Sequence, residues 1–524
     1  MRKILFLFLP ARFPTESSGK RSNSKASLPY GLLSMATYLK KYAKSEVDIR
    51  ILDLNANSLT LDEMVEEVEA ALAAFCPDIV GLSTLYNPAY PLVEPLTKAV
   101  KQFSGDIVTI VGGAVGSNLY DEILSEVATL DATCYSEGEI PLLDLMDSEN
   151  LPETLERHPS FITRKTLTAG KKPTAKLVEN LDDIPFLDLS MVDVSKYVSQ
   201  WGNDGTEGVS LSIHTSRGCP FKCVFCSAPK LHGSQMRYMS TARVLSDVKN
   251  MVDHYGMTSL SIMDDQFLIN KSRAKQILRG LAELNISVEF ASGLTLTYID
   301  EEMATLIKQA GAKSAVLAIE SGSDFVLREL INKPLALKKV RPVVEALKRQ
   351  GLFIIAFFVT GIPGETEKDR LETLKLITEV EIDWAVFVIA TPYKGTRLYD
   401  ICMENGYIDT KSVVRADVYI GTINTPYMSA EYITKRTYLM NLEANFINNP
   451  NIRNGNFSNI VAYLEQIATK YPNHAFAHRA LAIVYEGLHK DTALIEKHKT
   501  AYDNILRSDP MWRGYAEHFG LIAN

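Results

Sequence analysis

The stretch of sequence that decides the fold is Arg217-Gly-Cys-Pro-Phe-Lys-Cys-Val-Phe-Cys-Ser-Ala-Pro229, in which Cys219, Cys223 and Cys226 form a CxxxCxxC run. Three thiolates at this spacing can hold three corners of a [4Fe–4S] cluster and leave the fourth iron without a protein ligand. An iron that the protein leaves open can bind a further molecule. The run therefore predicts a reactive cofactor site.

A structural zinc site is the alternative to a cluster. Zinc in such sites takes four ligands, and His214 or His232 would complete a Cys3His set. The strand-like residues 209–215 precede the cysteines, and a helical stretch follows them. This order suits a cofactor loop at the top of a barrel, so we favour the cluster.

Composition limits the classes of protein. A chain of 524 residues with 46% apolar residues is too long for one core and indicates about three domains. The apolar start at residues 1–10 is cut off by Pro10, so we expect a buried first strand rather than a signal peptide or membrane span. No later run reaches the apolar length that a spanning helix needs, so we expect no membrane partner.

Charge and cysteine usage narrow the setting further. A net charge of −8 argues against a nucleic-acid partner. Cys76, Cys134 and Cys402 are scattered singly, so no disulfide framework is expected. A reducing, cytoplasmic location fits both the free thiols and an oxygen-sensitive cluster.

Residues 1–150 alternate short apolar runs with amphipathic ones. This alternation predicts a doubly wound, Rossmann-like α/β domain, which binds ligands beyond the carboxyl ends of its strands. The strand candidates are 3–9, 48–54, 79–84, 107–112 and 132–135, and the helix candidates include 30–42, 61–75 and 90–103.

A proline-containing connector is expected at residues 151–205, followed by a second α/β domain at residues 206–424. Six strand-like runs separated by helical patterns predict a partial (β/α)6 barrel, similar to an incomplete TIM barrel. The runs are 209–215, 259–263, 288–291, 314–319, 353–360 and 385–390.

Residues 425–524 predict an all-α domain with one to two degenerate tetratricopeptide-like units. So few repeats are not stable alone, so we expect this domain to pack against the barrel. The histidines of this domain are irregularly spaced, so we expect them at the surface or at helix caps rather than in a metal site. They are His474, His478, His489, His498 and His518.

With the cysteine run, three segments resemble the radical S-adenosylmethionine (SAM) enzymes: Met263-Asp-Asp-Gln-Phe267, Ala318-Ile-Glu-Ser-Gly-Ser323 and Phe358-Val-Thr-Gly-Ile-Pro-Gly-Glu-Thr366. In that family SAM chelates the open iron of the cluster. The resemblance implies that Glu320 binds the ribose or amino group of SAM and that Phe225 packs on its adenine. The full set of SAM-binding candidates is Phe225, Asp264, Asp265, Ser292, Glu320, Ser321, Gly361 and Thr391.

The order of segments over about residues 1–400 resembles the cobalamin (B12)-binding radical SAM enzymes. The resemblance places cobalamin at the strand ends of the first domain, with Thr84–Asn87 beneath the corrin. The histidine motif of other corrinoid proteins is missing, since the first histidine is His158. The cobalamin-binding candidates are Asn55, Ser83, Thr84, Leu85, Tyr86, Gly112, Gly113, Glu137, Gly138 and Glu139.

The resemblance implies a cobalamin-dependent methyltransferase that acts on a poorly activated carbon of a small-molecule or peptide substrate. A 5′-deoxyadenosyl radical would abstract hydrogen and methylcobalamin would supply the methyl group, with electrons from an external donor such as flavodoxin or ferredoxin. A related enzyme that catalyses cyclisation or rearrangement is one alternative. A methylthiotransferase is another, although its second cluster needs three N-terminal cysteines and only Cys76 and Cys134 are present. A scaffold or sensor built on the helical domain is a third.

Overall fold

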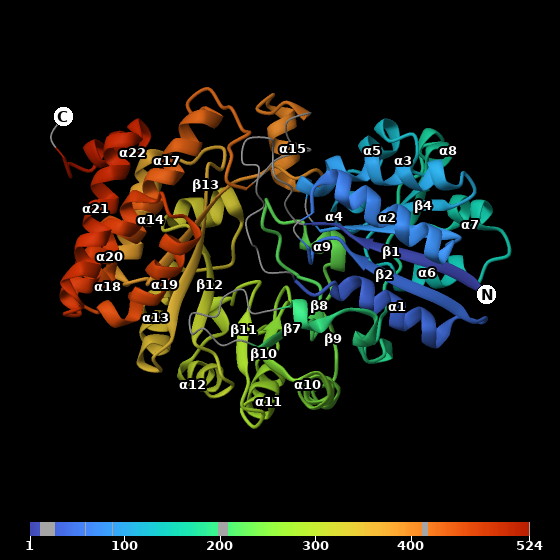
Figure 1. Cartoon of the computed structure of the whole chain (residues 1–524), viewed down its shortest axis with the longest axis horizontal. Coiled ribbons are helices and arrows are strands. Elements are labelled where there is room, and N and C mark those ends of the chain that lie inside the picture. The colour runs from blue at the N-terminus through green and yellow to red at the C-terminus, as the bar shows by residue number, and fades with distance from the viewer. Residues whose placement is uncertain (11–26, 58, 86, 198–207, 411–417, 523–524) are drawn as a thin grey trace. The chain divides into compact units, whose positions relative to one another are not determined.

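The computed structural model describes residues 1–10, 27–57, 59–85, 87–197, 208–410 and 418–522 (Figure 1). Its contacts divide the chain into two compact units. The first unit comprises Met1–Gln200, Glu207–Ser292 and Thr391–Asp417, and the second comprises Trp201–Thr206, Gly293–Ala390 and Val418–Asn524. The division runs through the predicted barrel, so three of its strands belong to each unit.

A six-stranded sheet in the order β2-β1-β3-β4-β5-β6 lies within the first unit. The strands are β1 (Arg2–Phe8), β2 (Val47–Asp53), β3 (Ile79–Thr84), β4 (Val108–Gly112), β5 (Ala132–Cys134) and β6 (Phe161–Thr163). The first five are parallel, as the doubly wound prediction requires, and β6 is antiparallel to β5. The sheet therefore continues, through β6, into the residues 151–205 that were expected to form a connector. The boundaries of the predicted domains stay a prediction.

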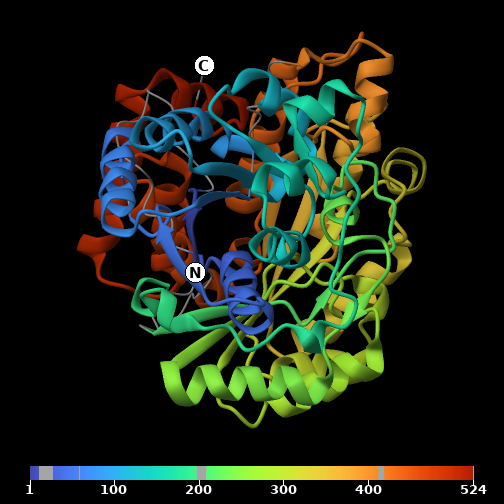
Figure 2. The same ribbon diagram turned by 90° about the vertical axis from the view of Figure 1, so that its right-hand side faces the viewer.

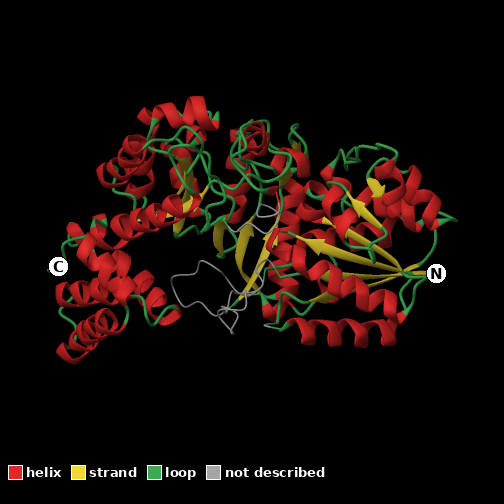
Figure 3. Ribbon diagram, turned by 90° about the horizontal axis from the view of Figure 1, so that it is seen from above, coloured by secondary structure: helices red, strands yellow, loops and turns green. Residues whose placement is uncertain are grey.

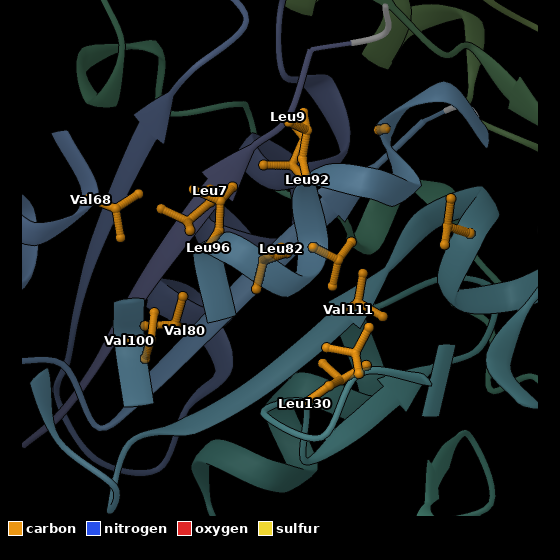
Figure 4. Close-up of a cluster of buried hydrophobic side chains, with 14 of the residues drawn as sticks. Leu7, Leu9, Val68, Val80, Leu82, Leu92, Leu96, Val100, Val111 and Leu130 are labelled. Carbon is orange, nitrogen blue, oxygen red and sulfur yellow. The ribbon is translucent and has the colours of Figure 1, made fainter. Parts of the chain in front are cut away.

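Side chains of β1 alternate between two apolar clusters, because successive residues of a strand point to opposite faces. Leu5, Leu7 and Leu9 join the cluster that contains residues of α2 (Leu61–Phe75) and α3 (Val93–Phe103), shown in Figure 4. Ile4, Phe6 and Phe8 join the cluster with residues of α1 (Tyr30–Tyr42) and α6 (Glu139–Met146). Helices therefore cover both faces of the sheet (Figure 3).

Local sequence explains where helices α2 and α3 begin. α2 starts at a capping box in which Thr60 and Glu63 each bond the other's backbone N–H. The helix predicted over 90–103 begins only at Val93, because Pro91 lies in a preceding 3₁₀ turn, η1 (Asn87–Leu92). Both helices end within the predicted limits.

A second, three-stranded parallel sheet of the first unit has the order β11-β10-β7. Its strands are β7 (Val209–Ile213), β10 (Met257–Ile262) and β11 (Ser287–Phe290). Helices α10 (Thr241–Tyr255) and α11 (Lys271–Leu281) connect them and lie side by side, yellow-green in Figure 2. These are the first three predicted barrel strands.

The second unit holds the other three strands, β12 (Ser314–Glu320), β13 (Phe353–Thr360) and β14 (Trp384–Ile389), in one parallel sheet. Val316, Ile355 and Trp384 of this sheet share an apolar cluster with C-terminal helices. The helices of that cluster are α17 (Ala430–Leu442), α19 (Phe457–Lys470), α20 (Ala475–Gly487), α21 (Thr492–Ser508) and α22 (Pro510–His518). The predicted packing of the helical domain against barrel strands is thus found for β12–β14.

The C-terminal histidines differ in part from expectation. His474 caps α20 by accepting a hydrogen bond from the backbone N–H of Ala477. His478 and His498 are buried, with their Nδ1 atoms 2.8 Å apart, so the surface expectation is wrong for this pair. Their rings pack between α20 and α21, which the irregular spacing did not reveal. None of the described helices is long and apolar enough to cross a membrane.

Candidate functional site

The three motif cysteines lie on a loop between the short strand β8 (Ser216–Arg217) and helix α9 (Ala228–His232). Cys219 is buried, Cys223 and Cys226 are half-buried, and none of the three forms a disulfide bond. The backbone N–H of Cys219 donates to the carbonyl of Gly233, and that of Cys226 donates to the carbonyl of Cys223, both at 3.1 Å. The loop is thus anchored at Cys219 and turns tightly between Cys223 and Cys226.

Thiol donors suit an iron–sulfur cluster, because clusters are held by cysteine thiolates. Among the described residues, no three His, Cys, Asp or Glu side chains lie together closely enough to hold a metal ion. Of the zinc alternative's two histidines, His232 directs Nδ1 to the Oδ2 of Asp265 at 2.8 Å. The assignment of the three thiols to a cluster rests on their spacing and donor chemistry.

Two of the predicted SAM-binding carboxylates brace the cysteine loop. Asp264 is buried and accepts hydrogen bonds from the N–H and hydroxyl of Thr215, both at 2.5 Å, and from the hydroxyl of Ser216 at 2.6 Å. Burial raises the pKa of Asp264. Asp265 accepts a 3.2 Å hydrogen bond from the N–H of Gly218, next to Cys219. A direct contact of either aspartate with SAM stays a prediction.

Ser292 and Thr391, also predicted to bind SAM, belong to the first unit. The Ser292 hydroxyl donates to the carbonyl of Met263 at 3.1 Å, and Thr391 is buried. Lys394, three residues after Thr391, forms ion pairs with Asp121, at 2.6 Å, and with Glu122. The turn after the last barrel strand is therefore attached to the first domain through Lys394.

Three further SAM candidates, Glu320, Ser321 and Gly361, lie in the second unit, whereas Phe225 lies on the cysteine loop of the first unit. Glu320 adopts a left-handed backbone conformation (φ 72°) at the end of β12 and pairs with Lys333 at 2.9 Å. Non-glycine residues in this conformation cluster at functional sites. The Ser321 and Thr373 hydroxyls are 3.4 Å apart, and the N–H of Gly361 donates to Glu365 at 2.6 Å. Lys333 could not be predicted from the sequence, because it belongs to no recognisable motif.

The cobalamin candidates on β2, β3 and β4 lie at the carboxyl edge of the first sheet. Thr84, buried at the end of β3, donates its hydroxyl to the carbonyl of Gly112 at 2.6 Å. Leu85 is 41% exposed, so the chain leaves the sheet at this point. Ser83 and Asn55 lie near the ends of β3 and β2, and Tyr86 lies outside the described residues.

Glu137 and Glu139, also predicted to bind cobalamin, are both ion-paired in the structure. Arg217 forms ion pairs with Glu137 at 3.0 Å and with Glu139 at 2.8 Å. Burial alone would raise the pKa of Glu139, but the charge and hydrogen bond of Arg217 outweigh it, and the pKa is lowered. Gly138 lies between the two glutamates, where a Cβ would overlap the sulfur of Met35. Contact of this segment with cobalamin stays a prediction.

Two sequence profiles of known domains match the chain. The profile of the radical SAM superfamily matches residues 213–377, and that of the B12 binding domain matches residues 27–146. The first match begins at the end of β7 and includes the cysteine run. The second includes most of the parallel sheet.

Two curated relatives share most of the chain. An uncharacterised methyltransferase of Pyrococcus horikoshii is 28% identical over 432 residues, which are 82% of this chain and 90% of that protein. The anaerobic magnesium-protoporphyrin IX monomethyl ester cyclase of Rubrivivax gelatinosus is 25% identical over 379 residues, which are 71% of this chain and 65% of that protein.

A solved structure supports the fold. TsrM from Kitasatospora setae, a radical SAM methyltransferase solved with cobalamin and a [4Fe–4S] cluster, is similar with a TM-score of 0.62 at 13% identity. The likeness covers 97% of this chain and 99% of TsrM. The predicted fold class is confirmed: an α/β chain with an N-terminal B12-binding domain, a radical SAM domain and a helical C-terminal region.

Proposed function

We propose that this chain, which belongs to the radical SAM enzymes that carry a B12-binding domain, transfers a methyl group to a poorly activated carbon of a small-molecule or peptide substrate. The observation that carries the proposal is the attachment of the cysteine loop to the first sheet through Arg217, Glu137 and Glu139. A radical SAM loop and a B12-binding domain that share one compact unit indicate two cofactors serving one reaction.

The cofactors of these two domains, a [4Fe–4S] cluster with SAM and cobalamin, supply hydrogen abstraction and a transferable methyl group when bound. The residues of the chain place them and exclude water. Cys219, Cys223 and Cys226 would hold the cluster, and Asp264 and Asp265 keep their loop in place through the hydrogen bonds described above.

The second unit contains a buried charged pair, Glu320 and Lys333, that we propose contributes to SAM binding. Glu320 is the candidate for the ribose hydroxyls or the amino group, and its buried partner Lys333 orients the carboxylate. The left-handed conformation of Glu320 turns the chain sharply at the strand end. Strained conformations of this kind cluster at ligand-binding sites, which supports a role for Glu320 in binding SAM.

A cyclisation or rearrangement on the same scaffold is the second candidate. The relative from Rubrivivax gelatinosus, named as a cyclase, favours it. Product mass separates the two functions, because methyl transfer adds one carbon to the substrate and a rearrangement adds none. Candidate substrates can be taken from the biosynthetic genes beside this one.

Methylthiotransferase and scaffold functions are disfavoured by the positions of particular residues. Cys76 follows α2 at the amino edge of the first sheet, whereas Cys134 ends β5 at the carboxyl edge, so the two thiols do not share a site for a second cluster. The C-terminal helices bury their apolar side chains against Val316, Ile355 and Trp384. The apolar face of these helices is therefore buried inside the chain, which disfavours its use as a scaffold surface.

The test of the proposed function uses anaerobically reconstituted protein, SAM, cobalamin, a reductant and candidate substrates. A reduced flavodoxin or ferredoxin is the expected physiological donor. We expect a product heavier by one methyl group. A product of unchanged carbon count would instead support the cyclisation alternative.

A further inference from the structure

A buried group of two arginines and two glutamates joins the cysteine loop to the loop after β5. We call Glu137, Glu139, Arg217 and Arg237 the buried clamp. Arg217 contacts both glutamates, and Arg237 donates both terminal nitrogens to Glu137, at 3.0 and 2.5 Å. No side chain of the clamp is more than 7% exposed. The positive and negative charges balance.

Stability alone does not account for such a group. Each charge loses its hydration on burial, and well-packed apolar residues often serve equally well or better. Ion pairs instead fix the relative orientation of the groups that they join, because the two terminal nitrogens of a guanidinium hold carboxylates in a defined geometry. The clamp fixes three segments that are distant in the sequence: the loop after β5, strand β8 and strand β9 (Arg237–Tyr238).

Further contacts connect the clamp to both loops. Ser34 of α1 donates its hydroxyl to Glu139 at 2.6 Å, which ties the clamp to the first domain. Arg237 donates to the carbonyl of His232 at 2.9 Å, and the next residue, Gly233, accepts the N–H of Cys219. The clamp therefore reaches Cys219 along two routes, through the chain from Arg217 and through Gly233.

We propose that the buried clamp sets the position of the cysteine loop relative to the carboxyl edge of the first sheet, and so the spacing of the cluster and cobalamin. Its members are positioning residues, since none needs to touch either cofactor through its side chain. The inference rests on the proposed function. It assigns Glu137 and Glu139 a part in that function other than the predicted cobalamin contact.

The test compares Glu139→Gln with Asp247→Asn in the full chain loaded with both cofactors. The first change removes one charge of the clamp at nearly constant shape. The control makes the same change in another buried ion pair of the first unit, Arg243–Asp247 on α10. Iron and cobalamin contents, and the magnetic coupling between the reduced cluster and cob(II)alamin measured by pulsed EPR, are the readouts.

We expect Glu139→Gln to keep near-normal cofactor contents but to broaden or shift the coupling, while Asp247→Asn leaves it as in the wild type. The ratio of 5′-deoxyadenosine to methylated product should rise several-fold in Glu139→Gln but not in Asp247→Asn. Arg217→Lys, which keeps the charge but loses the fork, should behave like Glu139→Gln.

An unchanged coupling in both clamp variants would overturn the inference, as would an equal change in Asp247→Asn. If neither clamp variant accumulates as folded protein while Asp247→Asn does, the clamp is a stability element and the inference is wrong. A wild-type protein that takes up no cobalamin is a different result, because it would overturn the proposed function itself.

Discussion

Gly113 and Thr84 lie side by side at the carboxyl edge of the first sheet, so close that a Cβ on Gly113 would overlap the carbonyl oxygen of Thr84. Gly113 has a φ of 78°, which costs other residues about 1–3 kcal/mol. Gly113→Ala should therefore lower the thermal midpoint by several degrees and weaken cobalamin binding. Gly105→Ala, with nothing within 4 Å of the added methyl, is the control. Normal cobalamin affinity in Gly113→Ala would contradict this view of the edge.

The cysteine motif predicts about four irons and four sulfides per chain after anaerobic reconstitution. Changing Cys219, Cys223 or Cys226 to Ala should abolish the iron, because each supplies one corner of the cluster. Cys76→Ser is the matched control, since Cys76 is exposed and lies outside the motif. Stoichiometric zinc without iron in anaerobically purified protein would support the Cys3His alternative.

Cobalamin should bind with its dimethylbenzimidazole displaced and without a histidine in its place, because residues 1–157 contain no histidine. The EPR spectrum of bound cob(II)alamin should then lack nitrogen splitting from an axial base. Free cob(II)alamin at neutral pH, with its own base coordinated, is the reference. Clear nitrogen coupling in the bound state would show that a base occupies the lower face.

Asn445 docks the helical domain on β14. Its side chain accepts from the N–H of Ala385 at 2.9 Å and donates to the carbonyl of the same residue at 2.8 Å. Asn445→Ala leaves two buried backbone groups unpaired and should lower the free energy of unfolding by about 3 kcal/mol. Asn454→Ala, an exposed position, should change it by less than about 0.5 kcal/mol. Equal effects in chemical denaturation would contradict the docking role.

Local patterns predicted much of the fold. The helices over 30–42 and 61–75 and the strand over 79–84 agree to the residue, because apolar periodicity and caps are encoded within each segment. The three-residue strand β6 was missed, since so short a strand carries no period. Pro91 moved the start of α3 through a 3₁₀ turn that periodicity alone does not report.

The candidate site was predictable only where a motif carries it. The cysteine spacing is local, so the loop was found. The partners of Arg217 and Arg237 were not, because Glu139 and Glu137 lie 78 and 100 residues away in the chain. Lys333 was missed for a related reason: its significance depends on the ion pair with Glu320, which only the fold reveals.

The most direct test of the central claim follows SAM that is labelled on its methyl carbon through single turnovers with reductant and the substrate. One methylation that uses both cofactors should consume two SAM molecules and yield one 5′-deoxyadenosine and one S-adenosylhomocysteine. The two by-products should rise together, and the label should appear in the product. Product and 5′-deoxyadenosine formed without S-adenosylhomocysteine, and without label in the product, would contradict methyl transfer.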